Sequence, residues 1–182
     1  MADDVFYKEL KEVDSPRGSI VPEGATTEEV EGEPVLRIPE TTISIDTPII
    51  FPGFRIIIEG SKLDISGETI VDAAIYGRTL EAINTVISAE KEIEVTETLR
   101  VAHVRGKTVR AERIEAKCVE ADLNVYGSKS VIAQSITVED GGVRTPILIT
   151  DRLDGEDLSV DSRDWDSSIT NGDVPQWLQP NS

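Results

Sequence analysis

The chain has 182 residues, a net charge of −17 at pH 7, 38% hydrophobic residues and only 4% aromatic residues. Its core must therefore consist mainly of Val, Ile, Leu and Ala, which suit a narrow, repetitive interior. The excess of acids argues against nucleic acid as a partner, because phosphate backbones are bound by Lys and Arg. The single cysteine excludes an intrachain disulfide, and no apolar run approaches the ~20 residues of a membrane-spanning helix.

Charge divides the chain into three parts. Residues 1–40 hold 11 acids and 4 bases, residues 41–150 hold 16 acids and 12 bases, and residues 151–182 hold 8 acids and 2 bases. The two outer parts are also rich in turn residues, so we expect disordered acidic tails over 1–40 and 151–182 and a folded domain over 41–150. An acidic surface is typical of proteins from a salt-rich cytoplasm, and we expect a halophilic source.

The N-terminal part contains one amphipathic stretch, residues 5–11. This stretch is either a frayed terminus or a segment that docks on a partner or on a membrane. The first residues are acidic and no apolar signal region follows them, so we expect the protein in the cytoplasm.

Residues 43–149 contain short β-rich runs in which apolar and polar residues alternate, without helical periodicity. Alternation with a period of two predicts half-buried strands. Glycines at 60, 67, 77, 106 and 127 are expected in the turns between these strands.

A branched residue, a spacer and an alanine recur at a constant interval, at residues 87–89, 109–111 and 131–133. A repeat of this length, about 22 residues, without helices favours a β-helix with about three short strands per coil and about five coils at most. The expected fold class is all-β: a short right-handed parallel β-helix, or β-solenoid, with disordered acidic tails. The alternative is a β-sandwich in which the spacing is coincidental.

The C-terminal part contains both tryptophans of the chain, Trp165 and Trp177, and the apolar residue Leu178. Trp177 and Leu178 belong to a compact apolar cluster in a polar surrounding. We expect this cluster either to fold back and cap one end of the solenoid or to act, with Trp165, as a short motif that binds a partner.

Few residues are suited to catalysis. His103 is the only histidine and Cys118 the only cysteine, so a metal site with several histidines or cysteines is excluded. We expect His103 to point outward from a strand and Cys118 to be a small buried hydrophobe. The chain is therefore not expected to be an enzyme or to hold a cofactor or metal. The alternative is a β-solenoid enzyme acting on carbohydrate or acyl substrates.

The branched-x-Ala repeat and the glycine-marked sites at residues 65–67, 75–77, 104–106 and 125–127 resemble those of bactofilins, polymer-forming cytoskeletal proteins, over residues 43–149. The resemblance implies a scaffold that affects cell shape, assembling end to end into filaments or regulating such a filament. It needs no nucleotide, and its partner is a second copy or a homologous solenoid protein. A viral or surface-appendage component is a further alternative.

Unpaired backbone groups at the first and last coils are the expected contact sites. The candidate interface residues are the apolar ones of the expected end coils: Ile43, Ile45, Ile49, Ile50, Val143, Ile147 and Ile149.

Overall fold

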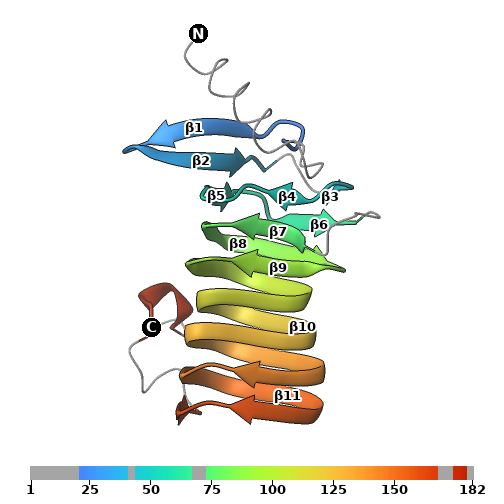
Figure 1. Cartoon of the computed structure of the whole chain (residues 1–182), viewed down its shortest axis with the longest axis vertical. Helices are drawn as coiled ribbons and strands as arrows, with labels where there is room; N and C mark the ends of the chain where they lie inside the picture. Colours follow the sequence, from blue (N-terminus) through green and yellow to red (C-terminus); the bar gives the residue numbers. More distant parts are fainter. Residues whose placement is uncertain (1–20, 41–43, 67–72, 168–173, 180–182) are drawn as a thin grey trace.

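The computed structural model describes residues 21–40, 44–66, 73–167 and 174–179. Within them the chain winds into a parallel β-solenoid of about seven turns, which confirms the expected fold class (Figure 1). The turn count exceeds the five coils expected. The strands are β1 (Thr26–Val30), β2 (Glu33–Ile38), β3 (Ser44–Ile45), β4 (Ile49–Ile50), β5 (Arg55–Ile58), β6 (Lys62–Ile65), β7 (Ala73–Gly77), β8 (Thr79–Ala89), β9 (Glu92–Val95), β10 (Thr98–Arg144), β11 (Ile147–Asp161) and β12 (Asp164–Asp166).

Each coil has three faces, named here A, B and C. On face A, β2 pairs with β5 and β5 with the start of β8; on face B, β3 pairs with β6 and β6 with the end of β8; on face C, β4 pairs with β7 and β7 with β9. All of these pairs are parallel. β10 is a continuous strand of 47 residues that winds through the following coils before β11 stacks on it.

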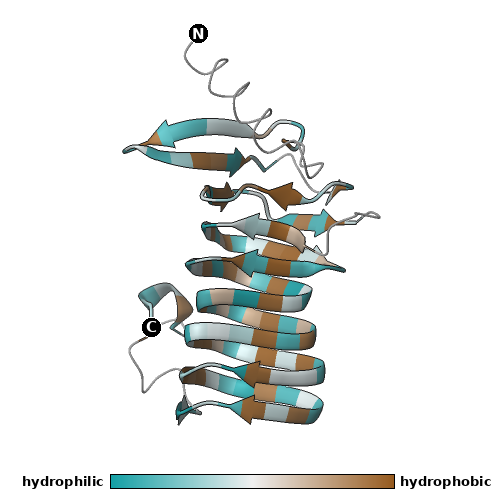
Figure 2. Ribbon diagram, viewed as in Figure 1, coloured by the Kyte–Doolittle hydropathy of each residue, from teal (hydrophilic) through white to brown (hydrophobic). Residues whose placement is uncertain are grey.

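Large apolar side chains at equivalent positions form ladders in the interior. Leu63, Ile87 and Val104 pair in turn on face B, and all three are fully buried. The ladder of face A consists of Leu36, Ile56, Leu80 and Leu99, and that of face C consists of Ile49, Ile75, Ile93 and Val109. Because strand spacing places equivalent side chains ~4.8 Å apart, these ladders form a continuous core, visible as apolar bands on successive coils (Figure 2).

A second inward position, two places after each large one, mostly holds a small residue. Gly77 and Gly106 occupy it within strands, so the expectation that they lie in turns is wrong. A Cβ at Gly77 would lie 2.6 Å from Cδ1 of Ile56, and a Cβ at Gly106 would lie 3.2 Å from Cδ1 of Ile93. The glycines are therefore required by the close approach of side chains from the preceding coil.

The coils do not have the length expected from the branched-x-Ala repeat. Ile49 pairs with Ile75 in the first coils, whereas Ile93 pairs with Val109 further along, so the coils are long at first and then become shorter than the repeat. Large buried residues in β10 follow one another at positions 99, 104, 109, 114 and 119, which gives the length of one face. The interval of the repeat is therefore about one coil plus one face. The branched-x-Ala motif repeats from face to face, not from coil to coil.

The solenoid extends beyond both expected boundaries, residues 41 and 150. At the N-terminal side, β1 and β2 form an antiparallel hairpin whose two-residue turn has positive φ at Glu31 (54°) and Gly32 (81°), as expected for a tight hairpin. At the C-terminal side, residues 151–161 continue β11 and residues 164–166 form β12. The described parts of both acidic tails therefore belong to the solenoid, because their apolar residues keep the ladder spacing while the acids occupy outward positions.

Ion pairs tie the hairpin to the coils that follow it. Nη1 of Arg37 lies 2.6 Å from Oε1 of Glu59 and its Nη2 lies 2.8 Å from Oε1 of Glu28. Nη2 of Arg78 lies 2.8 Å from Oε2 of Glu33. The hydrogen bond and positive charge of Arg78 lower the pKa of Glu33.

Candidate functional site

The C-terminal end of the solenoid is open. Leu153 pairs with Ile136, Val160 with Val143, and Trp165 with Leu148, so all three continue interior ladders. Their partners in the preceding coil are almost completely buried, whereas Leu153 and Val160 are half-buried and Trp165 is 54% exposed. The last coil therefore presents core positions that no further coil covers.

These side chains line one hollow at the end of the rod. We name the apolar residues Leu153, Leu158, Val160 and Trp165 the open end; Thr150, Asp151 and Ser167 complete the lining of the hollow. Leu153, Leu158 and Val160 pack against the main core on their inner side. In the described part of the chain, residues 152–161 of β11 pair with β10 on one side and with no strand on the other, so the open end combines an apolar surface with unpaired backbone groups.

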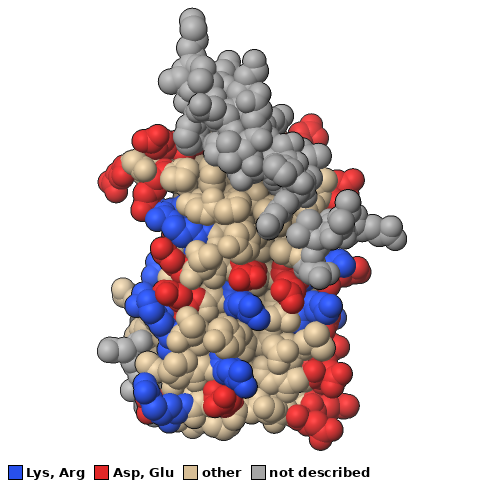
Figure 3. Space-filling view, viewed as in Figure 1, with Lys and Arg blue, Asp and Glu red and all other residues tan. Residues whose placement is uncertain are grey.

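Acidic residues surround the open end. Residues 151–167 contain seven acids and two bases, and acidic side chains gather at the lower corner of the rod beside β11 (Figure 3). The opposite end is also acidic, since residues 21–40 contain six acids and one base. Any contact between ends of two copies therefore brings like charges together.

The residues expected at the assembly interface have different positions. Ile43 lies outside the described residues, Ile45 is half-buried in β3, and Ile49 and Ile50 are buried in β4 of the first coil. At the other end the expected location is wrong. Val143 is 1% exposed and pairs with Val160, while Ile147 and Ile149 pair with β12. The chain continues for a further coil beyond these three residues, which places the open end at residues 153–165.

The C-terminal segment folds back onto the side of the rod, not onto its end. The short 3-10 helix η2 (Gln176–Leu178) contacts β10, and it lies beside the lower coils in Figure 1. Leu178 is fully buried against the outward pair Ile132 and Ile149, together with Val174 and partly buried Trp177. Nε2 of Gln134 donates a hydrogen bond of 3.0 Å to the carbonyl oxygen of Leu178. Of the expected partner motif, only Trp165 is exposed and lies at an end.

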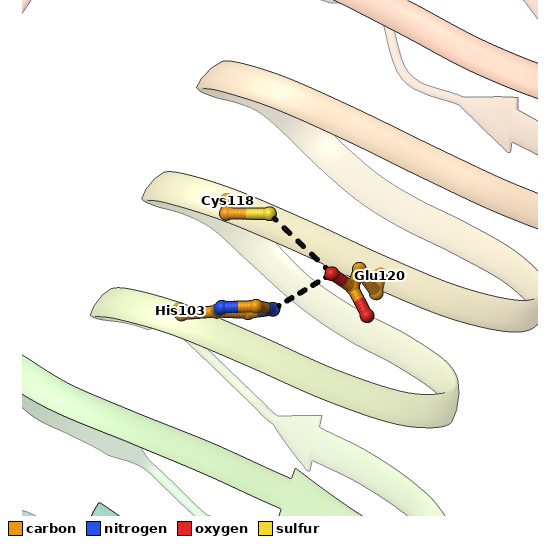
Figure 4. Close-up of side chains that lie close together, drawn as sticks. All are labelled: His103, Cys118 and Glu120. Carbon is orange, nitrogen blue, oxygen red and sulfur yellow. Dashed lines mark hydrogen bonds and ion pairs between the residues drawn. The ribbon is translucent and has the colours of Figure 1, made fainter.

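A second cluster lies on face B of the central coils. His103 lies one coil before Cys118 and Glu120, and the three side chains point toward one another (Figure 4). Nε2 of His103 is 3.1 Å from Oε1 of Glu120, and Sγ of Cys118 is 3.9 Å from the same oxygen. His103 points outward as expected, but Cys118 is only half-buried and also faces outward, so its assignment as a buried hydrophobe is wrong.

The surroundings of Cys118 favour the neutral thiol. Burial raises the pKa of the Cys118 thiol, Glu120 raises it further, and a hydrogen bond with Ser135 acts in the opposite direction. Nε2 of His103 is shielded from solvent, and its contact with Glu120 does not have hydrogen-bond geometry. The cluster thus brings together a nitrogen, a sulfur and an oxygen that no protein hydrogen bond fully satisfies.

Residues 5–11, the expected docking segment, lie outside the described residues. In the part of the chain that is described, no helix has the length and apolar character needed to cross a membrane. No protein-family model, curated protein or solved structure matches this chain.

Proposed function

We propose that this chain is a bactofilin-like cytoskeletal scaffold protein of the cytoplasm, which assembles end to end into a filament or binds the end of such a filament and regulates it. The observation that carries the proposal is the open end, where Leu153, Leu158, Val160 and Trp165 continue the core ladders without a covering coil. Its partner is a second copy of this chain or a homologous solenoid.

Both components of the open end favour an occupant with a solenoid edge. Burial of apolar surface contributes about 25 cal/mol per Å², and the exposed indole of Trp165 is a typical anchor of a protein interface. The free edge of β11 needs hydrogen-bond partners that another strand edge supplies. A contact between unlike ends propagates into a filament, whereas a contact between two open ends closes into a dimer.

The acidic ends make assembly dependent on salt. At low ionic strength the ends of two copies repel each other, and at 1 M salt the screening length falls to about 3 Å. Association through the open end should therefore increase with salt concentration. A basic partner would show the opposite dependence.

Sedimentation velocity and electron microscopy of the full chain at low and high salt test the proposal. The wild-type protein should form filaments or larger species at high salt, and Leu158→Asp and Trp165→Asp should reduce them. Ile83→Asp is the matched control, because Ile83 is 38% exposed in β8, away from the open end. If the wild-type protein stays monomeric at every salt concentration and does not bind filaments of a homologous solenoid, the proposal is wrong.

A further inference from the structure

We propose that His103, Cys118 and Glu120 form a binding site for one Zn²⁺ ion on face B of the solenoid. The proposal is independent of end-to-end assembly, because the cluster lies on the central coils and not at an end. Among the described residues, it is the group whose His, Cys and carboxylate ligand atoms lie close enough together to hold a metal, all within 4.8 Å of one another.

The distances between the ligand atoms fit a tetrahedral ion. Bond lengths of about 2.0–2.3 Å to nitrogen, oxygen and sulfur separate the ligand atoms of a tetrahedral zinc site by about 3.3–3.6 Å. In the protein the N–O distance is 3.1 Å and the S–O distance is 3.9 Å. The ligand atoms therefore need to move by only a few tenths of an ångström for these two distances to match, and rotation of partly exposed side chains allows this.

The backbone holds the three side chains at fixed positions. Cys118 and Glu120 are two positions apart in β10, so they project from the same face of one coil. His103 belongs to the same strand one coil earlier, where its residue pairs with Val86 of β8. Ligands placed on paired strands need little ordering when the metal binds, which favours affinity.

The chemistry of the donors selects the ion. A thiolate, an imidazole and one carboxylate suit Zn²⁺ and similar borderline ions, whereas Mg²⁺ and Ca²⁺ require oxygen ligands. On binding, the Cys118 thiol loses its proton to solvent and its sulfur bonds to the metal; His103 binds through the Nε2 lone pair and Glu120 through a carboxylate oxygen. With three protein ligands the fourth position is open to water, because His103 and Glu120 are 32% and 37% exposed.

An ion pair between His103 and Glu120 explains the cluster less well. The approach of Nε2 to Oε1 lacks hydrogen-bond geometry although the nitrogen is shielded from solvent, and such an ion pair leaves the Cys118 sulfur without a role. A cation between the three atoms satisfies all of them at once.

The composition of the chain makes the test unambiguous. Because His103 and Cys118 are the only histidine and the only cysteine, any thiolate-to-metal charge-transfer band of the Co²⁺-loaded protein comes from Cys118, and any metal-dependent imidazole NMR shift comes from His103. The experiment uses the full chain without a histidine tag, stripped of metal with a chelator, and titrates it with Zn²⁺ by calorimetry and with Co²⁺ by absorption.

The wild-type protein should bind one Zn²⁺ ion per chain, and Zn²⁺ should slow the reaction of Cys118 with a thiol reagent. His103→Gln, Cys118→Ser and Glu120→Gln should each weaken binding by at least about tenfold. Glu156→Gln is the matched control, because it removes the same charge from an exposed carboxylate of β11 and should leave binding unchanged. An excess of Mg²⁺ should not displace Zn²⁺.

Two results would overturn the proposal. The first is a triple variant, His103→Gln, Cys118→Ser and Glu120→Gln, that binds Zn²⁺ as tightly as the wild-type protein, which would assign binding to the acidic surface in general. The second is a wild-type protein whose Cys118 reacts with the thiol reagent equally fast with and without Zn²⁺. Circular dichroism of each variant checks that the solenoid is retained, and the second measurement needs no variant.

Discussion

The two ends of the solenoid close the same core in different ways. At the N-terminal end an antiparallel hairpin lies over face A, its ion pairs reach the next coils, and the rings of Phe51 and Phe54 pack edge to face at 5.3 Å in the first coils. At the C-terminal end the ladders simply stop, and Leu153 and Trp165 remain uncovered. Both ends are acidic, so charge does not distinguish them. The difference lies in whether local sequence supplies a cover.

The largest expected effect concerns side chains that fill these two ends. Phe54→Ala should lower the free energy of unfolding by about 3–5 kcal/mol, because Phe54 is 3% exposed and its loss leaves a cavity. Leu158→Ala at the open end should cost about 1 kcal/mol or less, because a half-buried side chain leaves no cavity. Chemical denaturation at low salt, where the chain is expected to be monomeric, measures both. Equal losses would contradict the contrast between a closed and an open end.

A smaller effect is expected where the C-terminal segment docks on the side of the rod. Leu178→Ala should weaken this docking by about 2–3 kcal/mol, because Leu178 is fully buried against Ile132 and Ile149. In a Trp165→Phe background Trp177 is the sole tryptophan, and its fluorescence should shift to the red as the segment detaches. Gln176→Ala, at an exposed position of the same helix, should leave the emission unchanged; a shift of equal size there would show that Leu178 does not hold the segment.

The smallest effect concerns the ion pair between Glu33 and Arg78 at the hairpin. The pKa of Glu33 is lowered in the folded protein, so its ionised form stabilises the fold at neutral pH. This contribution is lost as the pH falls through the lowered pKa. Glu33→Gln should therefore lower the denaturation midpoint slightly at neutral pH, and the difference from the wild-type protein should vanish in acid. A difference that persists below the pKa of Glu33 would assign it to packing.

The fold class was predictable because it depends on a pattern that sequence carries directly. Alternation of apolar and polar residues and the branched-x-Ala motif both describe how one face of a coil is filled, and every regular face is filled alike. The same property concealed the coil length, because the three copies of the motif lie on faces B, C and A, whereas residues that share a face, such as Ile93 and Val109, pair at a shorter interval. Spacing within a single face, from position 99 to 104 to 109 in β10, is the signal that gives the coil.

The open end and the metal cluster were harder to predict, for different reasons. Acidic composition over residues 151–166 suggested disorder, although Leu153, Leu158 and Trp165 keep the ladder spacing and provide the signal that was missed. His103 and Cys118 are separated by about one coil and are adjacent only once the coil length is known. The longer period of the branched-x-Ala motif places them on different parts of the surface.

The similarity of the three faces has a consequence for how the chain finds its correct alignment. A slip of the chain by one face would keep large side chains inside and polar ones outside, so the regular coils of β10 specify their own register only weakly. The β1–β2 hairpin forms from local contacts around the Glu31–Gly32 turn, and the first coils, in which Val35 pairs with Arg55 and Ile49 with Ile75, are longer than the regular ones. The irregular N-terminal coils therefore act as the starting point from which the following coils are aligned, and their loss would leave a rod with several competing registers.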